Sequence, residues 1–327
     1  MKHIPKRIAF NIVLAALLLP ASSTVKAGID SNTPPSAVVA AAGQEDAKPA
    51  PLPLHQIEGN GGLVTTLSAY IVNPQRKGQV VGLPATGFAY VNMGHDKDIE
   101  ALTLTESPIS RMEIGYGWDR MSLGNLPQAI RSAGVKNYTK NEVQLHNANL
   151  RFQVIKDGDF GESWMPAVTL GVHYKYNDGI SEVNQQVGGA LTAAGIRHDS
   201  GVDYTLYASK LFTKGVPIPV MVNLGGRATE AVWDGLGGFT NQYNFVFEGN
   251  IIVLPLPNLA LGAEFKQQPK DYSAVGNLVQ VESNWWTLDA AYVVNKNWTV
   301  AVAYGHFGDV LNSQCNDSWG ITTKWEF

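Results

Sequence analysis

Apolar and polar residues alternate along most of the chain after residue 85. From Val168 to Tyr176, apolar or aromatic residues occupy every second position, with Thr, Gly, His and Lys between them. A period of two is the pattern of a β-strand with one apolar face. The pattern predicts an all-β chain with about twelve strands, at 85–93, 99–106, 110–118, 144–155, 164–177, 202–214, 217–230, 242–254, 257–268, 284–294, 297–307 and 317–327.

The connections between these segments alternate in length. Residues 215–216 and 295–296 are short connections, 119–143 and 178–201 are long, and only 94–98 is short where a long one is expected. Strands of about ten residues in even number, with short turns on one side and long loops on the other, are typical of a transmembrane antiparallel up-and-down β-barrel. A soluble β-sandwich also alternates, but it does not explain strands of eleven or more residues or the alternating loop lengths. We therefore predict a barrel of the cell outer membrane, with outer-membrane lipid as its surroundings.

The last ten residues, SWGITTKWEF, keep the alternation to the end of the chain. Trp319 and Trp325 fall near opposite ends of the predicted lipid-facing stripe, where outer-membrane barrels carry aromatic girdles. The terminal Phe327 resembles the signal by which the bacterial barrel-assembly machinery recognises its clients. The resemblance implies that this machinery is a partner during biogenesis.

Three stretches near the start of the predicted barrel resemble a known family. They are AYIVNP (69–74), GLPATGFAYVNMG (82–94) and DIEALTLTES (98–107). They are similar to the opening of an uncharacterised family of predicted bacterial outer-membrane proteins, a domain of unknown function, over residues 61–126. The resemblance implies location and architecture, and it transfers no catalytic residue.

The first 27 residues have the features of a secretory signal peptide. A basic start precedes a short apolar stretch that Pro20 ends, and Ala27 completes a cleavage site of small residues. The alternative, a membrane-anchoring helix, needs about 20 apolar residues. We predict cleavage before Gly28.

The remainder divides into three parts. Residues 28–56 are rich in Pro and Ala and predict a periplasmic linker. Residues 57–84 form an N-terminal segment that precedes the barrel at 85–327. Within that segment, 63–73 is apolar enough for a strand, but a thirteenth strand would break the even count. It either enters the lumen as a plug or covers the periplasmic mouth.

One stretch of the long loops has a helical pattern. Ile180, Val183, Val187, Leu191 and Ala194 lie on one face of a helix predicted over 180–196. The helix either folds over the barrel opening or is an ordered loop without a gating role.

Composition narrows the class of protein. Charged residues make up 16% of the chain, against about 25% in an average soluble domain. All acidic residues follow the leader, which holds four of the 24 basic residues, so the predicted mature chain has a net charge of −8. This charge does not favour nucleic acid as a partner. The lone Cys315 excludes an internal disulfide.

The inward face of the barrel carries charges of both signs, because a charge on the lipid side is costly. These residues either line a narrow water-filled channel or neutralise one another and fill the barrel. The predicted pore-lining residues are Arg111, Glu113, Arg151, Lys175, Arg227, Glu248, Glu264, Lys266, Asp289 and Lys324.

The sequence predicts no catalytic residue, metal site or cofactor. The seven histidines show no metal-ligand spacing, and no spacing joins a Ser to a His and an acid as a hydrolase requires. The leading hypothesis is a narrow, porin-like channel for small solutes. The alternatives are a closed structural or surface-interaction barrel and, as a minor option, an outer-membrane lipid-modifying enzyme. The oligomeric state is left open.

Overall fold

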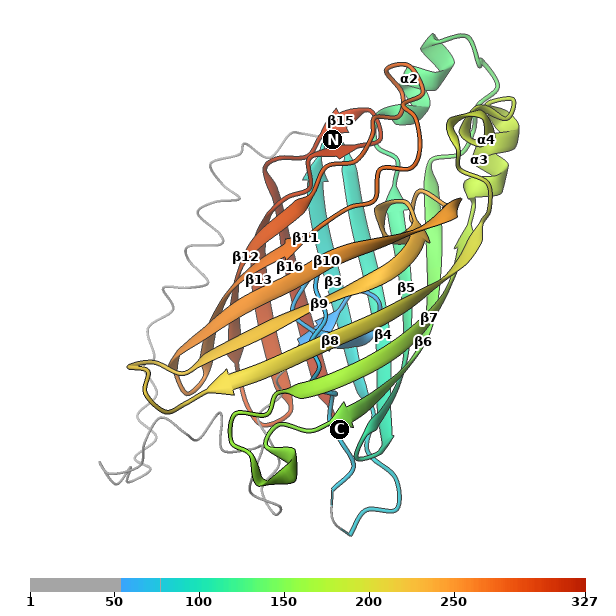
Figure 1. Cartoon of the computed structure of the whole chain (residues 1–327). Helices are drawn as coiled ribbons and strands as arrows, with labels where there is room; N and C mark the ends of the chain where they lie inside the picture. The colour runs from blue at the N-terminus through green and yellow to red at the C-terminus, as the bar shows by residue number, and fades with distance from the viewer. Residues whose placement is uncertain (1–53, 77) are drawn as a thin grey trace. The chain divides into compact units, whose positions relative to one another are not determined.

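Twelve antiparallel strands close into a barrel in the computed structural model, which describes residues 54–76 and 78–327 (Figure 1). Each strand pairs with its neighbours along the chain, and the last, β16 (Ser318–Glu326), pairs with the first, β3 (Ala85–Gly94). A closed sheet satisfies the backbone hydrogen bonds of its strands without an open edge. The predicted all-β, up-and-down barrel of twelve strands is confirmed.

Each predicted strand segment overlaps one barrel strand. The remaining barrel strands are β4 (Lys97–Ile109), β5 (Met112–Ser122), β6 (Glu142–Ile155), β7 (Ala167–Asp178), β8 (Ser200–Phe212), β9 (Val220–Ala231), β10 (Phe239–Leu256), β11 (Leu259–Lys266), β12 (Trp285–Val293) and β13 (Trp298–His306). Two strands, β7 and β9, begin three residues later than predicted, because Pro166 and Pro219 precede them and proline cannot donate to a strand ladder.

The outward faces of the strands carry large apolar side chains. Leu224 is 64% exposed, Phe247 62% and Leu288 54%. Aromatic rings lie among them, and those of Tyr90 and Trp319 are 5.7 Å apart. An exterior rich in apolar and aromatic side chains has the character of a lipid-facing surface.

The helices lie in the long loops. The predicted helix over 180–196 is wrong as a single element, because Gly188 and Gly189 adopt positive φ and divide it. Its predicted buried face is present in two pieces. The loop elements are α2 (Leu126–Ser132), α3 (Ile180–Gln186), α4 (Ala190–Ala194), the 3₁₀ turns η3 (Asp159–Gly161) and η4 (Trp233–Gly235), and the strand pair β14 (Asp309–Val310) and β15 (Ser313–Gln314). Among the described residues, no helix combines the length and the apolarity needed to span a membrane.

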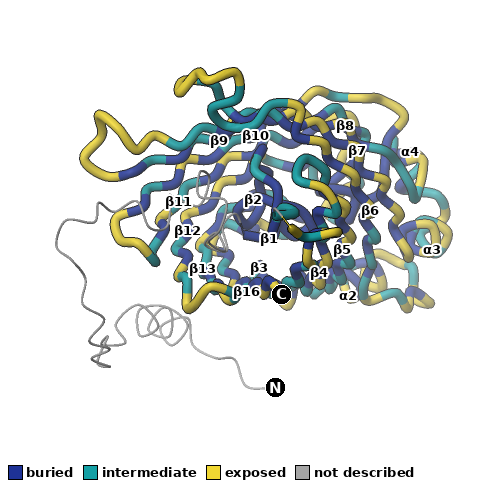
Figure 2. Tube along the Cα trace, turned by 90° about the horizontal axis from the view of Figure 1, so that it is seen from below, coloured by how far each residue is buried: buried dark blue, intermediate teal, exposed yellow. Residues whose placement is uncertain are grey.

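Residues 54–73, which we name the inner segment, lie within the ring of strands (Figure 2). They begin with a small hairpin of β1 (Leu54–Gln56) and β2 (Asn60–Gly62), and 63–73 contains no barrel strand. Its chain runs so close to β5 that a Cβ on Gly115 would lie 1.9 Å from the carbonyl oxygen of Gly59. Only glycine allows this approach. The predicted signal peptide and most of the predicted linker lie outside the described residues.

Buried apolar side chains of the long loops pack on inward-facing side chains at the strand ends that these loops connect. They pack on Val91, Met93, Ile99, Met121 and Trp285 of the wall and form one apolar cluster. We name the loop side chains of this cluster the outer cap: Leu123, Leu126, Ile130, Tyr138, Ile180, Val183, Leu191, Ile196, Val232, Trp233, Leu236, Tyr272, Val279, Phe307, Val310, Leu311 and Cys315.

Candidate functional site

Arg227 of β9 is the centre of a buried polar network between the inner segment and the barrel wall. Its Nη1 and Nη2 donate to the two carboxylate oxygens of Glu58, at 2.7 and 3.0 Å. Nη1 also donates to Asp203 Oδ2 at 2.9 Å, and Nε donates to Glu248. All four side chains are buried. The paired contact to Glu58 is the strongest form of an arginine–carboxylate interaction.

Lys175 of β7 completes the surroundings of Glu58. Its Nζ donates to Glu58 Oε1 and lies 2.8 Å from Asp203 Oδ2. His173, two residues earlier on the same face of β7, has its Nδ1 3.7 Å from Glu58 Oε2. Burial opposes the charged form of Glu58, but Arg227 and Lys175 outweigh it and hold the pKa of this carboxyl well below its ordinary value. Glu58 is therefore a carboxylate at neutral pH.

Glu264 of β11 holds the middle of the inner segment by its backbone. The N–H groups of Val64, Thr65 and Thr66 donate to its carboxylate oxygens at 2.8 to 3.1 Å. The hydroxyl of Thr66 donates to Oε2 at 2.6 Å, and that of Thr287 donates to Oε1 at 2.8 Å. An ionised acceptor satisfies several donors of an irregular backbone that would otherwise be buried without partners.

Glu113 and Arg151, on β5 and β6, hold the segment at two further points. Arg151 Nη1 donates to Glu113 Oε1 at 2.8 Å and to the carbonyl of Gly61 at 3.1 Å, and its Nη2 donates to the carbonyl of Ser68. Glu113 accepts from the backbone N–H of Gly61 at 3.2 Å and of Val72 at 2.6 Å. Both ends of this ion pair therefore bind the backbone of the inner segment.

Lys266 of β11 links the network to the loop between β9 and β10. Its Nζ donates to Asp234 Oδ2 in η4 at 2.6 Å and lies 3.7 Å from Glu248 Oε1. Lys175 also donates to the carbonyl of Asp234 at 3.0 Å. The loop that contributes Trp233 to the outer cap thus rests on the same charged groups that hold Glu58.

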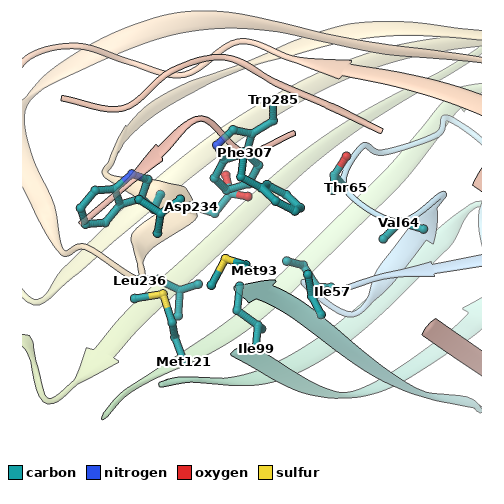
Figure 3. Close-up of a pocket in the computed structure, with 13 residues that line it drawn as sticks. Ile57, Val64, Thr65, Met93, Ile99, Met121, Asp234, Leu236, Trp285 and Phe307 are labelled. Atoms are coloured by element: carbon teal, nitrogen blue, oxygen red, sulfur yellow. The ribbon is translucent and has the colours of Figure 1, made fainter. Parts of the chain in front are cut away.

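A small cavity of about 20 Å³ lies between the inner segment and the outer cap. Figure 3 shows Ile57, Val64 and Thr65 of the segment on one side of it, with Leu236 and Phe307 of the loops on the other. Its lining is almost entirely apolar, and its volume is close to that of one water molecule.

The structure places nine of the ten predicted pore-lining residues on the inward face, buried. Asp289 shares the Thr287 hydroxyl with Glu264, and Lys324 Nζ donates to Glu326 Oε1 at 2.8 Å. The tenth, Arg111, lies elsewhere. The turn between β4 and β5 takes up Ser110 and Arg111, and the Arg111 guanidinium reaches Asp159 Oδ2 at 2.8 Å, outside the luminal network.

The aromatic residues predicted for the girdles point outward. Trp325 is 43% exposed and Phe327 54%, while Trp319 is half-buried against Tyr90. The backbone N–H of Phe327 donates to the carbonyl of Pro84 at 3.1 Å, so the chain end continues the contact between β16 and β3. The assembly signal itself stays a prediction.

Sequence reasoning missed three of the buried acidic residues, Asp203, Asp119 and Glu58. On β8, Asp203 points to the same inward face as Thr205 and Tyr207, because the three residues occupy alternate positions. The alternation alone would therefore have identified it. Asp119 was assigned to a loop, but β5 extends to Ser122 and buries it. Glu58 lies in a hairpin turn without periodicity. The available signal was charge. The predicted inward residues comprise six bases and four acids, so further acids are needed to balance the buried positive charge.

Hydrolytic and metal sites have no support from the described contacts. The Ser209 hydroxyl donates to Asn223 and to no histidine, and the backbone N–H of Ala69 donates to Ser209 Oγ at 2.7 Å. Over 54–76 and 78–327, no group of three or more His, Cys, Asp or Glu is placed to hold a metal ion.

The family model described as "Protein of unknown function (DUF3034)" matches residues 53–323, so the chain belongs to this family. The family resemblance drawn from the sequence is confirmed to this extent. No curated protein matches the chain.

Solved structures that are similar to this chain include a porin and other outer-membrane proteins. The KdgM porin in complex with disordered oligogalacturonate has 8% identity and a TM-score of 0.44, covering 74% of this chain and 99% of that chain. Omp33 of Acinetobacter baumannii has 9% identity and a TM-score of 0.41, covering 76% and 100%. The calcium-bound dimer of the outer membrane phospholipase of Salmonella typhi has 11% identity and a TM-score of 0.35, covering 77% and 94%. At these identities the likeness concerns the fold alone.

Proposed function

We propose that this member of the DUF3034 family is a porin-like channel of the bacterial outer membrane for small solutes, and that the inner segment closes it in the state described here. The observation that carries the proposal is how the lumen is filled. The wall presents glycines and hydrogen-bonding side chains to the interior, and the volume is occupied by a separate stretch of chain. Barrels of about eight strands are narrow enough for the side chains of their own strands to fill, whereas in this barrel of twelve strands a separate stretch of chain lies in the interior.

The charged contacts support a removable segment. Arg151, Glu113 and Glu264 bind backbone groups of the inner segment, and Arg227 and Lys175 bind its Glu58. Exchanging such contacts for water costs much less than exposing an apolar core of equal size, because the buried charges regain hydration. The lumen is therefore suited to a wet state after the segment leaves.

Conductance in a planar bilayer tests the channel. We expect the full-length protein to show rare, small openings. A variant without residues 28–73 should show a larger steady conductance for small ions and exclude oligosaccharides. If both forms stay silent after verified insertion, the channel proposal fails.

A closed structural barrel is the second candidate, and the outer cap favours it. The cap buries Trp233, Phe307 and Leu311 in one apolar cluster with the strand ends. Such a cluster would not open without exposing apolar surface to water. Under this alternative the protein acts through its outer loops, and removing the inner segment changes stability without producing conductance.

The apolar exterior of the barrel supports the proposed location in the outer membrane. We expect the mature protein to fractionate with the outer membrane and to change its electrophoretic mobility on boiling, as closed barrels do. Recovery as a soluble periplasmic protein would contradict both candidates, because the apolar exterior would then face water.

Assembly gives a separate prediction at the chain end. Phe327→Asp, or deletion of Phe327, should lower the amount of assembled barrel far more than Lys324→Gln does. The first change removes an outward aromatic ring and the proposed assembly signal, whereas the second alters an inward ion pair. Heat-modifiable protein in outer-membrane fractions is the measurement. Equal assembly of the two variants would show that Phe327 carries no signal.

A further inference from the structure

We infer that the barrel wall contains a binding site for a small carboxylate, formed by Arg227 and Lys175 beside His173 and filled in this state by the side chain of Glu58. The inference extends the proposed function, because it names small carboxylate-bearing solutes as the class that the opened channel would prefer. The site itself is defined by contacts on the wall and does not depend on conductance.

The geometry around Glu58 is that of a bound carboxylate. Arg227 donates one hydrogen bond to each carboxylate oxygen, at 2.7 and 3.0 Å, and Lys175 adds a donor to Oε1. The Nδ1 of His173 lies 3.7 Å from Oε2. A guanidinium fork with a second cation recognises the planar carboxylate group specifically.

The wall holds this site in place without Glu58. Arg227 Nε donates to Glu248, and Nη1 lies 2.9 Å from Asp203 Oδ2. Lys175 Nζ lies 2.8 Å from the same Asp203 oxygen. The cations therefore keep their positions when the segment leaves, and a site whose donors are fixed beforehand loses little entropy on binding a ligand.

Glu58 enters the site as a ligand would. It is the only acidic residue of the inner segment, which has no Lys or Arg. It sits in the turn of the β1–β2 hairpin, so that a single carboxylate projects from a short loop toward the two cations. A solute carboxylate at this position would compete with Glu58. The contact that closes the lumen and the contact that selects the solute are thus the same contact.

Chemical rescue by acetate in the full-length protein tests the site. Glu58→Ala removes the carboxylate and leaves the cations of the wall. We expect this variant to unfold at a lower temperature than the wild type in semi-native electrophoresis. Sodium acetate should restore part of the loss in a saturable way, beyond sodium chloride at equal ionic strength.

The matched control is Glu58→Gln, whose amide fills the same space. It should lose stability as well, but acetate and chloride should then act alike, because no space for a ligand is left. The double variant Glu58→Ala with Lys175→Met should also lose the acetate response. An acetate effect on Glu58→Ala no larger than that of chloride, or equally large in Glu58→Gln, would overturn the inference.

If Glu58→Ala assembles poorly, refolding yield from urea replaces melting as the readout. Acetate should raise that yield and chloride should not, and equal yields in the two salts would count against the site. If acetate rescues the variant but no conductance is seen in planar bilayers, the carboxylate site stands and the channel proposal fails. If conductance is seen without acetate rescue, the channel proposal stands and the carboxylate site fails.

Discussion

The inner segment meets the barrel wall through buried charges, backbone hydrogen bonds and small apolar clusters, such as that of Leu63 with Met221 and Ile252, whereas the outer cap meets it through one large apolar cluster. Glu58, Glu113 and Glu264 are each bound to donors across the first interface, and Trp233 and Phe307 are buried in the second. A buried ion pair returns little more free energy than its desolvation costs, while apolar burial contributes about 25 cal/mol per Å². We therefore expect the segment to be the part that leaves and the cap to be the part that persists.

The two regions are nonetheless connected. Ile57 and Val64 of the segment border the cavity beneath the cap (Figure 3). Lys266 and Lys175 donate hydrogen bonds to Asp234 in η4. Loss of the segment removes apolar contacts and one carboxylate from beneath Trp233. The cap should loosen when the segment leaves, although its own apolar cluster remains.

The largest effect should come from Arg227→Met. The change leaves Glu58, Asp203 and Glu248 as buried carboxylates without their shared partner, and breaking a buried pair in this way costs about 3–5 kcal/mol of unfolding free energy. Urea denaturation followed by semi-native electrophoresis measures the loss. The control is Arg120→Met, whose partly exposed pairs with Asp98, Glu100 and Glu142 should be worth at most about 1 kcal/mol. Equal losses of unfolding free energy in the two variants would show that the buried network contributes no more to stability than the partly exposed ion pairs do.

Trp233→Ala should damage the cap and spare the barrel. Removing a buried Trp costs roughly 3–5 kcal/mol where the site cannot collapse, but here we expect the cost to fall on loop packing. Limited proteolysis should cut the long loops faster, while the heat-modifiable barrel band persists. Trp164→Ala, at a side chain 67% exposed, is the control and should change neither readout. Loss of the whole barrel in Trp233→Ala would show that cap and strands unfold as one unit.

Glu264→Gln should have the smallest effect. The amide oxygen still accepts hydrogen bonds, but the charge is lost and an NH₂ group replaces the second acceptor. A bond to a charged group is worth about 1.5–3 kcal/mol against about 1 for a neutral one. Hydrogen exchange at the backbone amides of Val64, Thr65 and Thr66 should accelerate. Exchange in β11 and β12 should stay slow. Glu100→Gln on the exterior is the control, and unchanged exchange at all three amides would show that Glu264 does not hold the segment.

The barrel was predictable from the sequence because its rules are local. Each signal, whether alternation, loop length or a terminal aromatic residue, concerns a single strand or turn. Every strand has the same period of two, because one face of the sheet is apolar and the other faces a polar interior. Boundaries moved where prolines or turns intervene, as at Pro166 and Arg111. The helix over 180–196 failed at two adjacent glycines, whose backbone freedom apolar periodicity does not register.

The network was only partly predictable, because it depends on non-local pairing. The alternation of inward and outward positions assigned Arg151, Lys175 and Arg227 to the interior. It does not indicate which acid each of them binds. Glu58 is more than 160 positions from Arg227 and lies in a turn with no period. Contacts between an irregular segment and a regular wall are fixed by tertiary structure alone.

Peptide block of the shortened channel tests the central claim, that a separable segment closes the lumen through polar contacts. A synthetic peptide of residues 54–73 is added to the variant without residues 28–73 in a planar bilayer. We expect a saturable, reversible fall in conductance from one side of the membrane only, and a weaker block by the same peptide with Glu58→Ala. Open channels that neither peptide blocks, or that both block equally, would contradict the claim.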